Sequence, residues 1–506
     1  GGPLIEEITR RLGFLIEVGL GYLTIGRSAP GLAGGEIQRV RLAGQLGSGL
    51  QGVVFILDEP SVGLHPRDNR RLLKALCKLR DKGNTVIVVE HDQETMELAD
   101  HIVDLGPGAG KEGGEVIAEG SFESITSSEG SLTGDYLAGR STARQNKAGH
   151  SSPMGSLQIS GIFHNNLRDV NADIPLGCLV AVTGVSGSGK SSLVNQVLRP
   201  ALVRKLGSRA TLHGTYRSIS GHEDLDKVIS VDQSPIGKSS RSNPATYSKA
   251  FSLIRELFAR TPGARARGYR ASRFSFNVDG GRCLECVGAG TINVDMQFLA
   301  PVEVSCEACG GHRYNRETLE IRYRGKNIAE VLDMTIDEAL HLFEPVPRLS
   351  RTLGTLQQLG LGYLKLGQPA TTLSGGEGQR LKLANELQKT NTGNTLYLLD
   401  EPTTGLAMSD IHQLIDVLLR IRRNGHTVII IEHHLDLINN ADWIIDLGPG
   451  AGDMGGEIVA EGSPEQISGI KHSYTAQYLK SHIARLEAHT VASSAAPSLN
   501  TNKLSH

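Results

Sequence analysis

The sequence predicts an α/β fold in which one module is complete and a second module is present only in part. A stretch from Gly19 to Gly120 is repeated from Gly360 to Gly462; within it LAGGEIQR is matched by LSGGEGQR and FILDEPSVGL by YLLDEPTTGL. In both copies short apolar runs alternate with helical spacing, as in parallel sheets covered by helices. The glycine-rich segment GVSGSGKSS occurs once, before the second copy, so only that module is predicted to be whole.

The first copy, which we expect over residues 1–138, has the pattern of alternating helices and strands. Its two apolar runs are short, which predicts buried strands that deliver polar residues at their ends. In chain order the pattern predicts a helix, a loop and a helix over 1–50, a strand over 53–57 ending in Asp58-Glu59, a helix over 68–80, and a strand over 85–89 ending in Glu90-His91. Because no glycine-rich loop precedes this copy, we expect residue 1 to be an internal point of a longer ancestral protein.

The rest of the chain divides by composition. One polar segment rich in Gly, Ser and Ala is typical of a linker, and the last residues, rich in Ser, Ala and Asn, are typical of a disordered tail. A stretch with cysteines interrupts the second copy. We therefore expect a linker at 139–156, the glycine-rich-loop part of the second module at 157–254, an inserted domain at 255–345, the remainder of the second module at 346–482, and a disordered tail at 483–506.

Size and composition exclude several classes of protein. At 506 residues the chain exceeds the length at which one hydrophobic core keeps growing, so more than one domain is expected. The formal net charge of −2 excludes a uniformly cationic nucleic-acid binder. No run reaches the roughly 20 apolar residues that span a bilayer. The start of the sequence has no signal-peptide pattern, so a cytoplasmic protein is expected.

The segment that occurs once has the context of a phosphate-binding loop, because it follows a predicted strand over 179–183 and precedes a predicted helix from Lys190. Backbone N–H groups of the loop would cradle phosphate oxygens, Lys190 would contact the β- and γ-phosphates, and Ser191 would hold Mg²⁺. A Gly/Ser linker, the alternative, requires neither the strand nor the helix. The candidate nucleotide-binding residues are Gly184, Val185, Ser186, Gly187, Ser188, Gly189, Lys190, Ser191 and Ser192.

Polar residues at the ends of predicted strands are candidates for ATP hydrolysis. Asp400 follows an apolar run and would bind Mg²⁺, and Glu401 is the candidate general base that orients the attacking water. His433 ends the next strand and would contact the γ-phosphate, while Gln233 would lie near the metal and the water. Each residue alone is more often an ordinary polar group at a strand end. Their order after one phosphate loop favours the catalytic interpretation.

The repeated LSGGE-type segment is the marker that separates one class of P-loop ATPase from the others. On the full set of motifs the chain resembles the ABC ATPase superfamily. That resemblance implies that a nucleotide on Lys190 is completed by the marker segment of the other copy. The candidate marker residues are Ser374, Gly375 and Gly376 in the second copy and Ala33, Gly34 and Gly35 in the first.

Replacement of Ala33 by serine is expected to raise the rate of ATP hydrolysis. The second copy has Ser374 at the matching position, so the first copy lacks a hydroxyl donor to the γ-phosphate. A hydrogen bond to a charged group contributes about 1.5–3 kcal/mol, which predicts weakened rather than abolished closure. Steady-state hydrolysis by the parent and the variant measures the effect, and equal rates would remove the role assigned to the missing hydroxyl.

The first copy has strand-end residues Asp58, Glu59 and His91 but no phosphate loop of its own. Without the loop N–H groups and a lysine, these side chains are not expected to hold ATP tightly. We therefore expect one tightly bound nucleotide per chain.

Four of the six cysteines form a candidate metal centre. Cys283 and Cys286 form one Cys-x-x-Cys pair, Cys306 and Cys309 form another, and 19 residues separate the pairs. This spacing is typical of a closed, structural Zn²⁺ site, whereas a dithiol redox centre is the alternative. The alternating residues from Thr291 to Phe298 predict a hairpin between the pairs. The isolated Cys77 and Cys178 are expected to be small buried apolar residues.

Arginines gather in the sequence before the first cysteine, and few acidic residues accompany them. Arginine contacts phosphates, so this segment predicts binding to a nucleic-acid backbone that weakens steeply with salt; a solvated surface is the alternative. The interleaved aromatic residues Tyr269, Phe274 and Phe276 are expected to stack or wedge against bases. The arginines are Arg255, Arg260, Arg265, Arg267, Arg270, Arg273 and Arg282, of which Arg265, Arg267, Arg270 and Arg273 are the candidate DNA contacts.

A closer resemblance rests on QSPIGKSSRSNPATYSKAF, ARGYRASRFSFNVDGGRCLEC, RYNRETLEIRYRGKNIAEVLDMTIDEA and TTLSGGEGQRLKLANEL. On these segments, and over nearly all of residues 1–480, the chain resembles the UvrA family, the ABC-type damage-recognition subunits of bacterial nucleotide excision repair. The resemblance implies a cytoplasmic homodimer that hydrolyses ATP with Mg²⁺, carries Zn²⁺, binds damaged double-stranded DNA and hands lesions to UvrB. Such a subunit is not itself the nuclease.

The sequence departs from the family pattern in several places. An earlier phosphate loop, a UvrB-binding domain and a further zinc module are absent from it, so docking of UvrB by this chain alone is not expected. Ala407 stands where the family usually has histidine, whereas the first copy has His65 at the matching position.

Other functions fit the motifs less well. A transporter ATPase would not carry the zinc insertion, and a chromosome-maintenance ATPase would need long coiled coils. Two alternatives stay open: a truncated UvrA-like paralogue that binds DNA with weak ATPase activity, for example in tolerance of DNA-binding drugs, and a non-enzymatic interaction fragment.

Overall fold

A computed structural model describes the protein at residues 2–28, 34–47, 50–108, 110, 113–140, 153–232, 234, 236–237, 239–294, 296, 302–389 and 393–495. The chain forms two compact units. Unit 1 consists of Gly1–Gly108, Glu112–Ser230 and Asn391–His506, and unit 2 of Ala109–Lys111 and Val231–Thr390. Among the described residues, no helix has both the length and the apolar character needed to cross a membrane.

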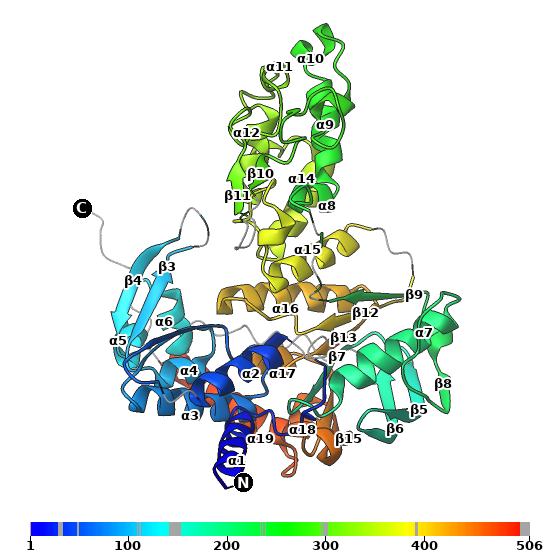
Figure 1. Ribbon diagram of the computed structural model, residues 1–506. Coiled ribbons are helices and arrows are strands. Elements are labelled where there is room, and N and C mark those ends of the chain that lie inside the picture. The colour runs from blue at the N-terminus through cyan, green and yellow to red at the C-terminus, as the bar shows by residue number, and fades with distance from the viewer. Residues whose placement is uncertain are drawn as a thin grey trace, which may run out of the picture. The chain divides into compact units, whose positions relative to one another are not determined.

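The second copy is built on a six-stranded sheet with β7 at its interior (Figure 1). β7 runs parallel to β13 on one side and β14 on the other, and β12 continues the parallel order beyond β13. Every residue of β7 and β13 is buried, as their apolar sequences predict. The strand order is β15 (Glu457–Gly462), β14 (Trp443–Gly448), β7 (Leu179–Gly184), β13 (Thr427–Ile431), β12 (Thr395–Asp400) and β9 (Lys227–Val231).

A smaller antiparallel sheet and several helices complete this part of unit 1. One hydrophobic core joins β7, β12 and β13 to the antiparallel sheet and to the helical segment after β7. The antiparallel strands are β5 (Ser156–His164), β6 (Leu167–Pro175) and β8 (Ser218–Ser220). The helical segments are η3 (Ser192–Leu198), α7 (Arg199–Lys205), η4 (His222–Asp224), α16 (Met408–Arg423), α17 (Leu435–Asn439), η7 (Gly452–Met454), α18 (Pro464–Ser468) and α19 (Tyr474–Ala495).

The first copy repeats the same local structure without a central strand. Its parallel pair is β1 (Val54–Asp58) with β2 (Thr85–Val89), and its antiparallel pair is β3 (Ile102–Gly106) with β4 (Glu115–Gly120). Even the register irregularity after Asp104 recurs after Asp446. The helices are α1 (Gly2–Glu17), α2 (Gly34–Gly47), α3 (Pro66–Asp81), α4 (Gln93–Leu98), α5 (Phe122–Ser127) and α6 (Leu132–Leu137).

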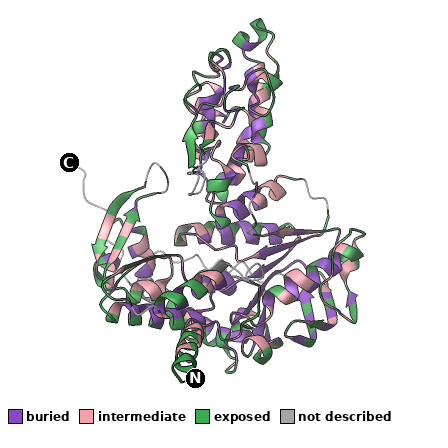
Figure 2. Ribbon diagram, viewed as in Figure 1, coloured by how far each residue is buried: buried purple, intermediate pink, exposed green. Residues whose placement is uncertain are grey.

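The prediction that both strands of the first copy are buried was wrong. Val54 and Ile56 of β1 are 59% and 73% exposed, whereas the core of β12 is fully buried. Figure 2 shows the same contrast between exposed β3 and β4 and buried β12 and β13. In the described part of the chain, no strand lies between β2 and β3, while β7 fills the matching place between β13 and β14. The apolar sequences of β1 and β2 alone do not show whether a further strand packs beside them.

The predicted linker and the predicted tail differ in how far the structure describes them. Most of the predicted linker, residues 141–152, lies outside the described residues. Helix α19 continues to Ala495, so it crosses residues 483–495, which composition assigned to a disordered tail. Ala, Leu, Arg and Glu in this segment are strong helix formers, which accounts for the difference.

Unit 2 is mostly helical and carries the cysteine insertion. Strands β10 (Thr291–Val294) and β11 (Val302–Ser305) pair antiparallel and form the hairpin that the alternating residues predict. The helical segments are α8 (Pro244–Tyr247), α9 (Ala250–Ala259), α10 (Pro262–Ala266), η5 (Ala271–Phe274), α11 (Arg316–Leu319), α12 (Ile328–Asp333), α13 (Ile336–Leu342), α14 (Pro347–Gln358), η6 (Ala370–Thr372) and α15 (Gly375–Leu387).

Candidate active site and metal centre

The predicted phosphate loop connects β7 to a helix, as its sequence context requires. Lys190 is buried, and its ammonium group donates to the backbone oxygens of Gly184 (2.9 Å) and Val185 (3.1 Å). Burial lowers the pKa of Lys190 to about 8, although the nearby carboxylates of Glu401 and Asp68 act in the opposite direction. The lysine is therefore held against the loop, where it is predicted to contact the phosphates of a bound nucleotide.

The predicted catalytic acids lie at the end of β12, beside this loop. Asp400 accepts a hydrogen bond from the side-chain amide of Asn195 (2.8 Å), which comes from the helical segment after the loop. Glu401 has a left-handed backbone (φ 46°), and its N–H donates to the oxygen of Ile431 on β13 (2.9 Å). Burial, together with the neighbouring Asp400 and Glu432 carboxylates, raises the pKa of Glu401 to about 7. A carboxyl poised near neutrality suits a general base.

His433 follows β13 and is 8% exposed. Among the described residues, neither ring nitrogen of His433 has a hydrogen-bond partner. Burial holds the pKa of His433 well below its usual value, so the imidazole is neutral. Gln233, the other predicted residue of this group, lies outside the described residues.

The first copy contacts the candidate site of the second at three places. The Asp68 carboxylate accepts a hydrogen bond from the backbone N–H of Ser186 (3.0 Å). The Tyr22 ring lies over Gly187, where an added Cβ would come within 2.8 Å of it, so only glycine fits. Gly63 lies so close to the Glu401 carboxylate that a Cβ there would be 2.9 Å from Oε1. One composite site is thus formed by residues of both copies.

The marker segments begin helices α2 and α15. In α15 the Ser374 hydroxyl accepts from the N–H of Glu377 (3.2 Å), and the Glu377 carboxylate accepts from the N–H of Ser374 (2.7 Å), which caps the helix at Gly375 and Gly376. The Tyr363 hydroxyl donates to the same carboxylate.

In the first copy, helix α2 starts at Gly34 and continues through Gly35. Tyr22 donates to the Glu36 carboxylate (2.6 Å), as Tyr363 does in the second copy. Ala33 lies outside the described residues. Tyr22 therefore joins the marker helix of the first copy to the phosphate loop of the second.

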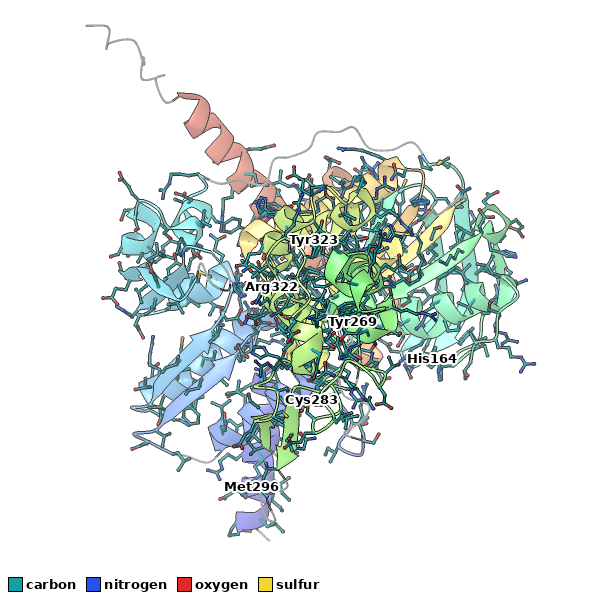
Figure 3. All side chains as sticks on the ribbon, turned by 90° about the horizontal axis from the view of Figure 1, so that it is seen from above. His164, Tyr269, Cys283, Met296, Arg322 and Tyr323 are labelled. Atoms are coloured by element: carbon teal, nitrogen blue, oxygen red, sulfur yellow. The ribbon has the colours of Figure 1, made fainter. Side chains whose placement is uncertain are left out.

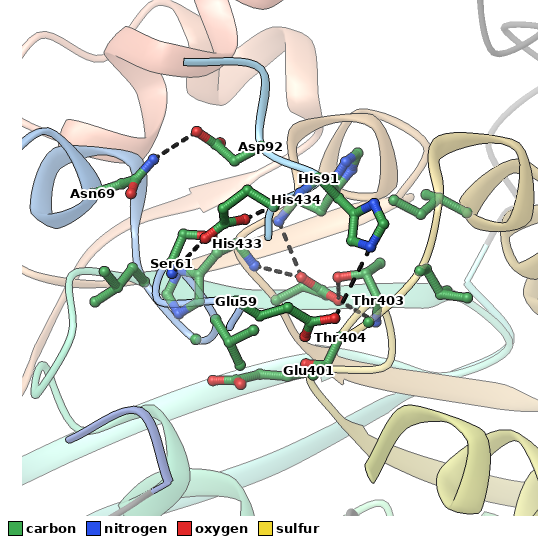
Figure 4. A pocket seen from close by; sticks show the side chains of 18 of the residues that line it. Glu59, Ser61, Asn69, His91, Asp92, Glu401, Thr403, Thr404, His433 and His434 are labelled. Atoms are coloured by element: carbon green, nitrogen blue, oxygen red, sulfur yellow. Dashed lines mark hydrogen bonds and ion pairs between the residues drawn. The ribbon is translucent and has the colours of Figure 1, made fainter. Parts of the chain in front are cut away.

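A cavity of about 160 Å³ lies between the matching strand ends of the two copies (Figure 4). The copies line it in matching ways: the N–H of Ser61 donates to Glu90 (2.8 Å) in the first, and the N–H of Thr403 donates to Glu432 (3.0 Å) in the second. Glu59, the counterpart of Glu401, lies 4.0 Å from the His91 ring. The first copy thus keeps the strand-end geometry of a catalytic site without a phosphate loop.

Sequence reasoning missed Tyr22, Gly63 and Asp68. The repeated GLGYL segment marks Tyr22 and Tyr363 as a matched pair and was a usable signal. Nothing local marks Asp68, because it acts on a loop 118 positions away in the chain.

The four predicted metal ligands converge in unit 2. Their Sγ atoms all lie within 4.8 Å of one another; the closest distances are 3.7 Å between Cys286 and Cys309 and 4.0 Å between Cys283 and Cys306. Four thiolates at 2.3 Å from a tetrahedral Zn²⁺ would be about 3.8 Å apart, so the residues fit this metal. The backbone N–H of Gly290 also donates to the Cys286 sulfur (3.3 Å). Figure 3 labels Cys283 and Met296, with the hairpin strands between them.

The two isolated cysteines differ from each other. Cys178 is buried as expected, but Cys77 is only partly buried, so the prediction was wrong for Cys77. The residues of its helix α3 that belong to the hydrophobic core are Leu72, Ala75, Leu76 and Leu79, and Cys77 is not among them.

The four candidate DNA-contacting arginines fall into two pairs. Arg265 and Arg270 are exposed, and neither has an ion pair among the described residues. Arg267 instead forms an ion pair with Glu320 (2.7 Å), and Arg273 donates to Thr318 (2.9 Å). Only Arg265 and Arg270 can therefore contact a ligand without first giving up a bond to another side chain.

The predicted role of two aromatic residues in base stacking was wrong. Phe274 and Phe276 are fully buried, and the Phe276 ring stacks on Phe251 at 4.9 Å between centroids. They form the core of the insertion. Burial of a large apolar ring is favourable even where its neighbours in the sequence are polar. Tyr269 is partly exposed, and the Arg273 guanidinium lies 4.5 Å from its centroid.

Three comparisons with known proteins bear on this site. No family model matches the chain. The chain is 55% identical to the UvrABC system protein A of Clostridium perfringens over 480 residues, which cover 95% of this chain and 51% of that protein. It therefore spans about half the length of the curated relatives that it matches.

Solved structures are similar over the same range. The crystal structure of UvrA2 from Deinococcus radiodurans superposes with a TM-score of 0.87 at 48% identity and covers 93% of this chain and 57% of that chain. A model of ribosome-bound archaeal Pelota and ABCE1 matches with a TM-score of 0.52 at 17% identity, over 90% of this chain and 60% of that chain, which shows the fold alone. The ABC-type α/β fold with a cysteine insertion is thus confirmed.

Proposed function

Since this chain belongs to the UvrA family over the half of those relatives that it spans, we propose that it is an ATP-binding and ATP-hydrolysing subunit that recognises damage in double-stranded DNA. The observation that supports the proposed ATPase activity is the composite site. A phosphate loop with a buried lysine, a carboxyl with its pKa near 7 and an unpartnered buried histidine meet there.

Residues of this chain would hold each proposed cofactor. The loop from Gly184 to Ser192 would hold the phosphates of ATP, and Ser191 with Asp400 would hold Mg²⁺. Mg²⁺ would neutralise charge on the phosphates, while Glu401 orients the attacking water and His433 contacts the γ-phosphate. The four cysteines would hold Zn²⁺ in a closed site without an open position, which gives the metal a structural role.

Calorimetry with a non-hydrolysable ATP analogue and Mg²⁺ tests this function together with steady-state hydrolysis. We expect one tight nucleotide per chain and turnover that Lys190→Ala removes, because that lysine contacts the phosphates. Two tight sites per chain would contradict the assignment of the first copy as a site without nucleotide. Turnover that survives in Lys190→Ala would show that the activity does not come from this loop.

The partners are proposed from the same family. The name of these relatives, UvrABC system protein A, places those proteins in a multi-protein system. We propose damaged duplex DNA as the ligand, a second copy of this chain as the partner in a homodimer, and UvrB as a further partner of the complete family protein. Comparison of lesion-bearing and intact duplex tests the first proposal, since equal affinity for both would count against a damage sensor.

Replacement of Arg265 and Arg270 by alanine is expected to weaken duplex binding and to flatten its salt dependence. Each phosphate contact that is lost lowers the slope of log K against log salt by about 0.9. Binding is measured by fluorescence anisotropy over a salt series. Arg322→Ala is the matched control, because that exposed arginine is held in an ion pair with Glu330 (3.2 Å). Equal slopes for the double variant and the parent would rule out these two contacts.

A further inference from the structure

His65 of the first copy is buried deep beside the composite site. It is 2% exposed and caps the N-terminus of α3, where its Nδ1 accepts a hydrogen bond from the backbone N–H of Arg67 (3.2 Å). Burial, with the nearby Lys190 charge, lowers the pKa of His65 to about 3, so the ring is neutral. Since Nδ1 is an acceptor, the single ring proton must be on Nε2.

The Nε2–H group has an acceptor that comes from the far end of the second copy. It lies 3.2 Å from the hydroxyl oxygen of Thr475, and that hydroxyl donates in turn to the buried carboxylate of Asp446 (2.6 Å). Asp446 also accepts from Thr183 (2.8 Å), at the end of the strand that leads into the phosphate loop, and from Ser473 (2.7 Å). The hydrogen bonds run in one direction, from the Arg67 N–H to His65, from His65 to Thr475 and from Thr475 to Asp446. This order fixes both the tautomer and the plane of the His65 ring.

The fixed ring lies against the histidine that is predicted to contact the γ-phosphate. The centroids of His65 and His433 are 5.9 Å apart with an interplanar angle of 87°, and Tyr478 meets His65 from another side at 5.7 Å and 87°. His433 itself has no side-chain hydrogen bond among the described residues. Edge-to-face packing on His65 therefore restrains rotation of the His433 ring.

The second copy offers an internal comparison. Ala407 occupies the place of His65, caps no helix with its side chain and is exposed. Thr133 donates to Asp104 (2.8 Å) as Thr475 donates to Asp446. The hydroxyl–carboxylate pair is thus present in both copies, whereas a histidine at this position is present only in the first.

We propose that His65 is a positioning residue of the ATP site: held by Thr475 and Asp446, it keeps the His433 ring directed at the γ-phosphate. The assignment rests on the proposed ATPase function and goes beyond it, because it gives the first copy a specific part in the chemistry of the second. His65 acts through His433 and does not itself contact the nucleotide.

The test separates positioning from folding by comparing a triphosphate with a diphosphate. His65→Ala is expected to lower turnover roughly 10- to 100-fold, as misplacement of a catalytic group by about 1 Å does. It should weaken binding of a non-hydrolysable ATP analogue and leave the affinity for ADP unchanged, because only the γ-phosphate meets His433. His65→Gln, whose amide can still donate to Thr475, should restore part of the turnover.

Two threonine variants form the matched control. Thr475→Val removes the acceptor of the His65 N–H group and should lower turnover in the same direction, whereas Thr133→Val removes the equivalent bond where no histidine lies and should leave turnover unchanged. Parental turnover in His65→Ala and Thr475→Val would overturn the proposal, as would equal losses of ADP and ATP-analogue affinity. If the unaltered chain binds no ATP analogue, the proposed function fails and this inference fails with it.

Discussion

Replacement of Glu401 by glutamine is expected to lower ATP turnover about 100- to 10,000-fold while nucleotide still binds, the range that a positioned general base contributes. Glutamine keeps the shape of the side chain beside Gly63 but removes the carboxylate that would orient and deprotonate the attacking water. The loop lysine and the loop N–H groups are untouched, so binding of an ATP analogue should persist. Single-turnover hydrolysis and calorimetry on the same protein separate the two effects.

The pH dependence of the parent enzyme belongs to the same prediction. Burial raises the pKa of Glu401 to about 7, and the carboxyl acts as a base only when it is ionised. Turnover should therefore be low below this pKa, rise as the pH increases through about 7, and level off above it. In Glu401→Gln the rise should disappear.

Glu59→Gln is the control for the first copy. Glu59 lies at the matching strand end, and burial raises its pKa as well, but no phosphate loop stands beside it in its own copy. Its loss should change turnover far less than the loss of Glu401. Equal effects of the two substitutions would mean that both copies take part in hydrolysis and would refute the single-site assignment.

Replacement of Cys306 by serine is expected to abolish zinc binding and to unfold the segment around the two cysteine pairs. Cys306 is fully buried within the cluster of four sulfurs, and the core beside it consists mainly of the other cysteines. Structural zinc sites contribute about 10–16 kcal/mol of apparent binding energy, which is folding energy for a small module. Zinc content by atomic absorption and calorimetric melting of the whole chain measure the loss.

Cys77→Ser is the matched control for this experiment, because Cys77 is a partly buried cysteine on α3 and belongs to no cluster. It should keep the full zinc content and a nearly parental melting profile. A strong chelator applied to the unaltered chain should reproduce the effect of Cys306→Ser. Purified protein that is folded, zinc-free and oxidised at these cysteines would instead support the redox alternative.

The sequence was most informative where chemistry depends on residues close together in the chain. The glycine-rich loop from Gly184 to Ser192 follows β7, Asp400 ends β12 and His433 follows β13, as the spacing predicts. The cysteine pairs also converge, because closed thiolate sites use short Cys-x-x-Cys turns. These elements are specified by backbone geometry over a few residues, which the sequence shows directly.

The contacts that Asp68, Tyr22 and His65 make across the fold could not be predicted in this way, although the repeated GLGYL segment marks Tyr22 itself. Each joins the first copy to residues that are remote in the chain, and each residue type is common in surfaces and cores alike. Phe274 and Phe276 give the opposite lesson, since aromatic residues among arginines suggested base stacking and proved to be core. Pattern and composition do not specify which partner a side chain meets across the fold.

The sequence by itself determined the local structure of both copies, because hydrogen-bond register and strand ends depend on neighbouring residues. Asp58 pairs with Val89 and Asp400 with Ile431 in the same register. Only the tertiary structure decided what each copy became. With β7 beside β13 the strands of the second sheet are buried and the candidate phosphate loop follows β7, whereas β1 exposes Ile56 in the described structure. Burial is a property of what packs against a strand, and those neighbours come from elsewhere in the chain.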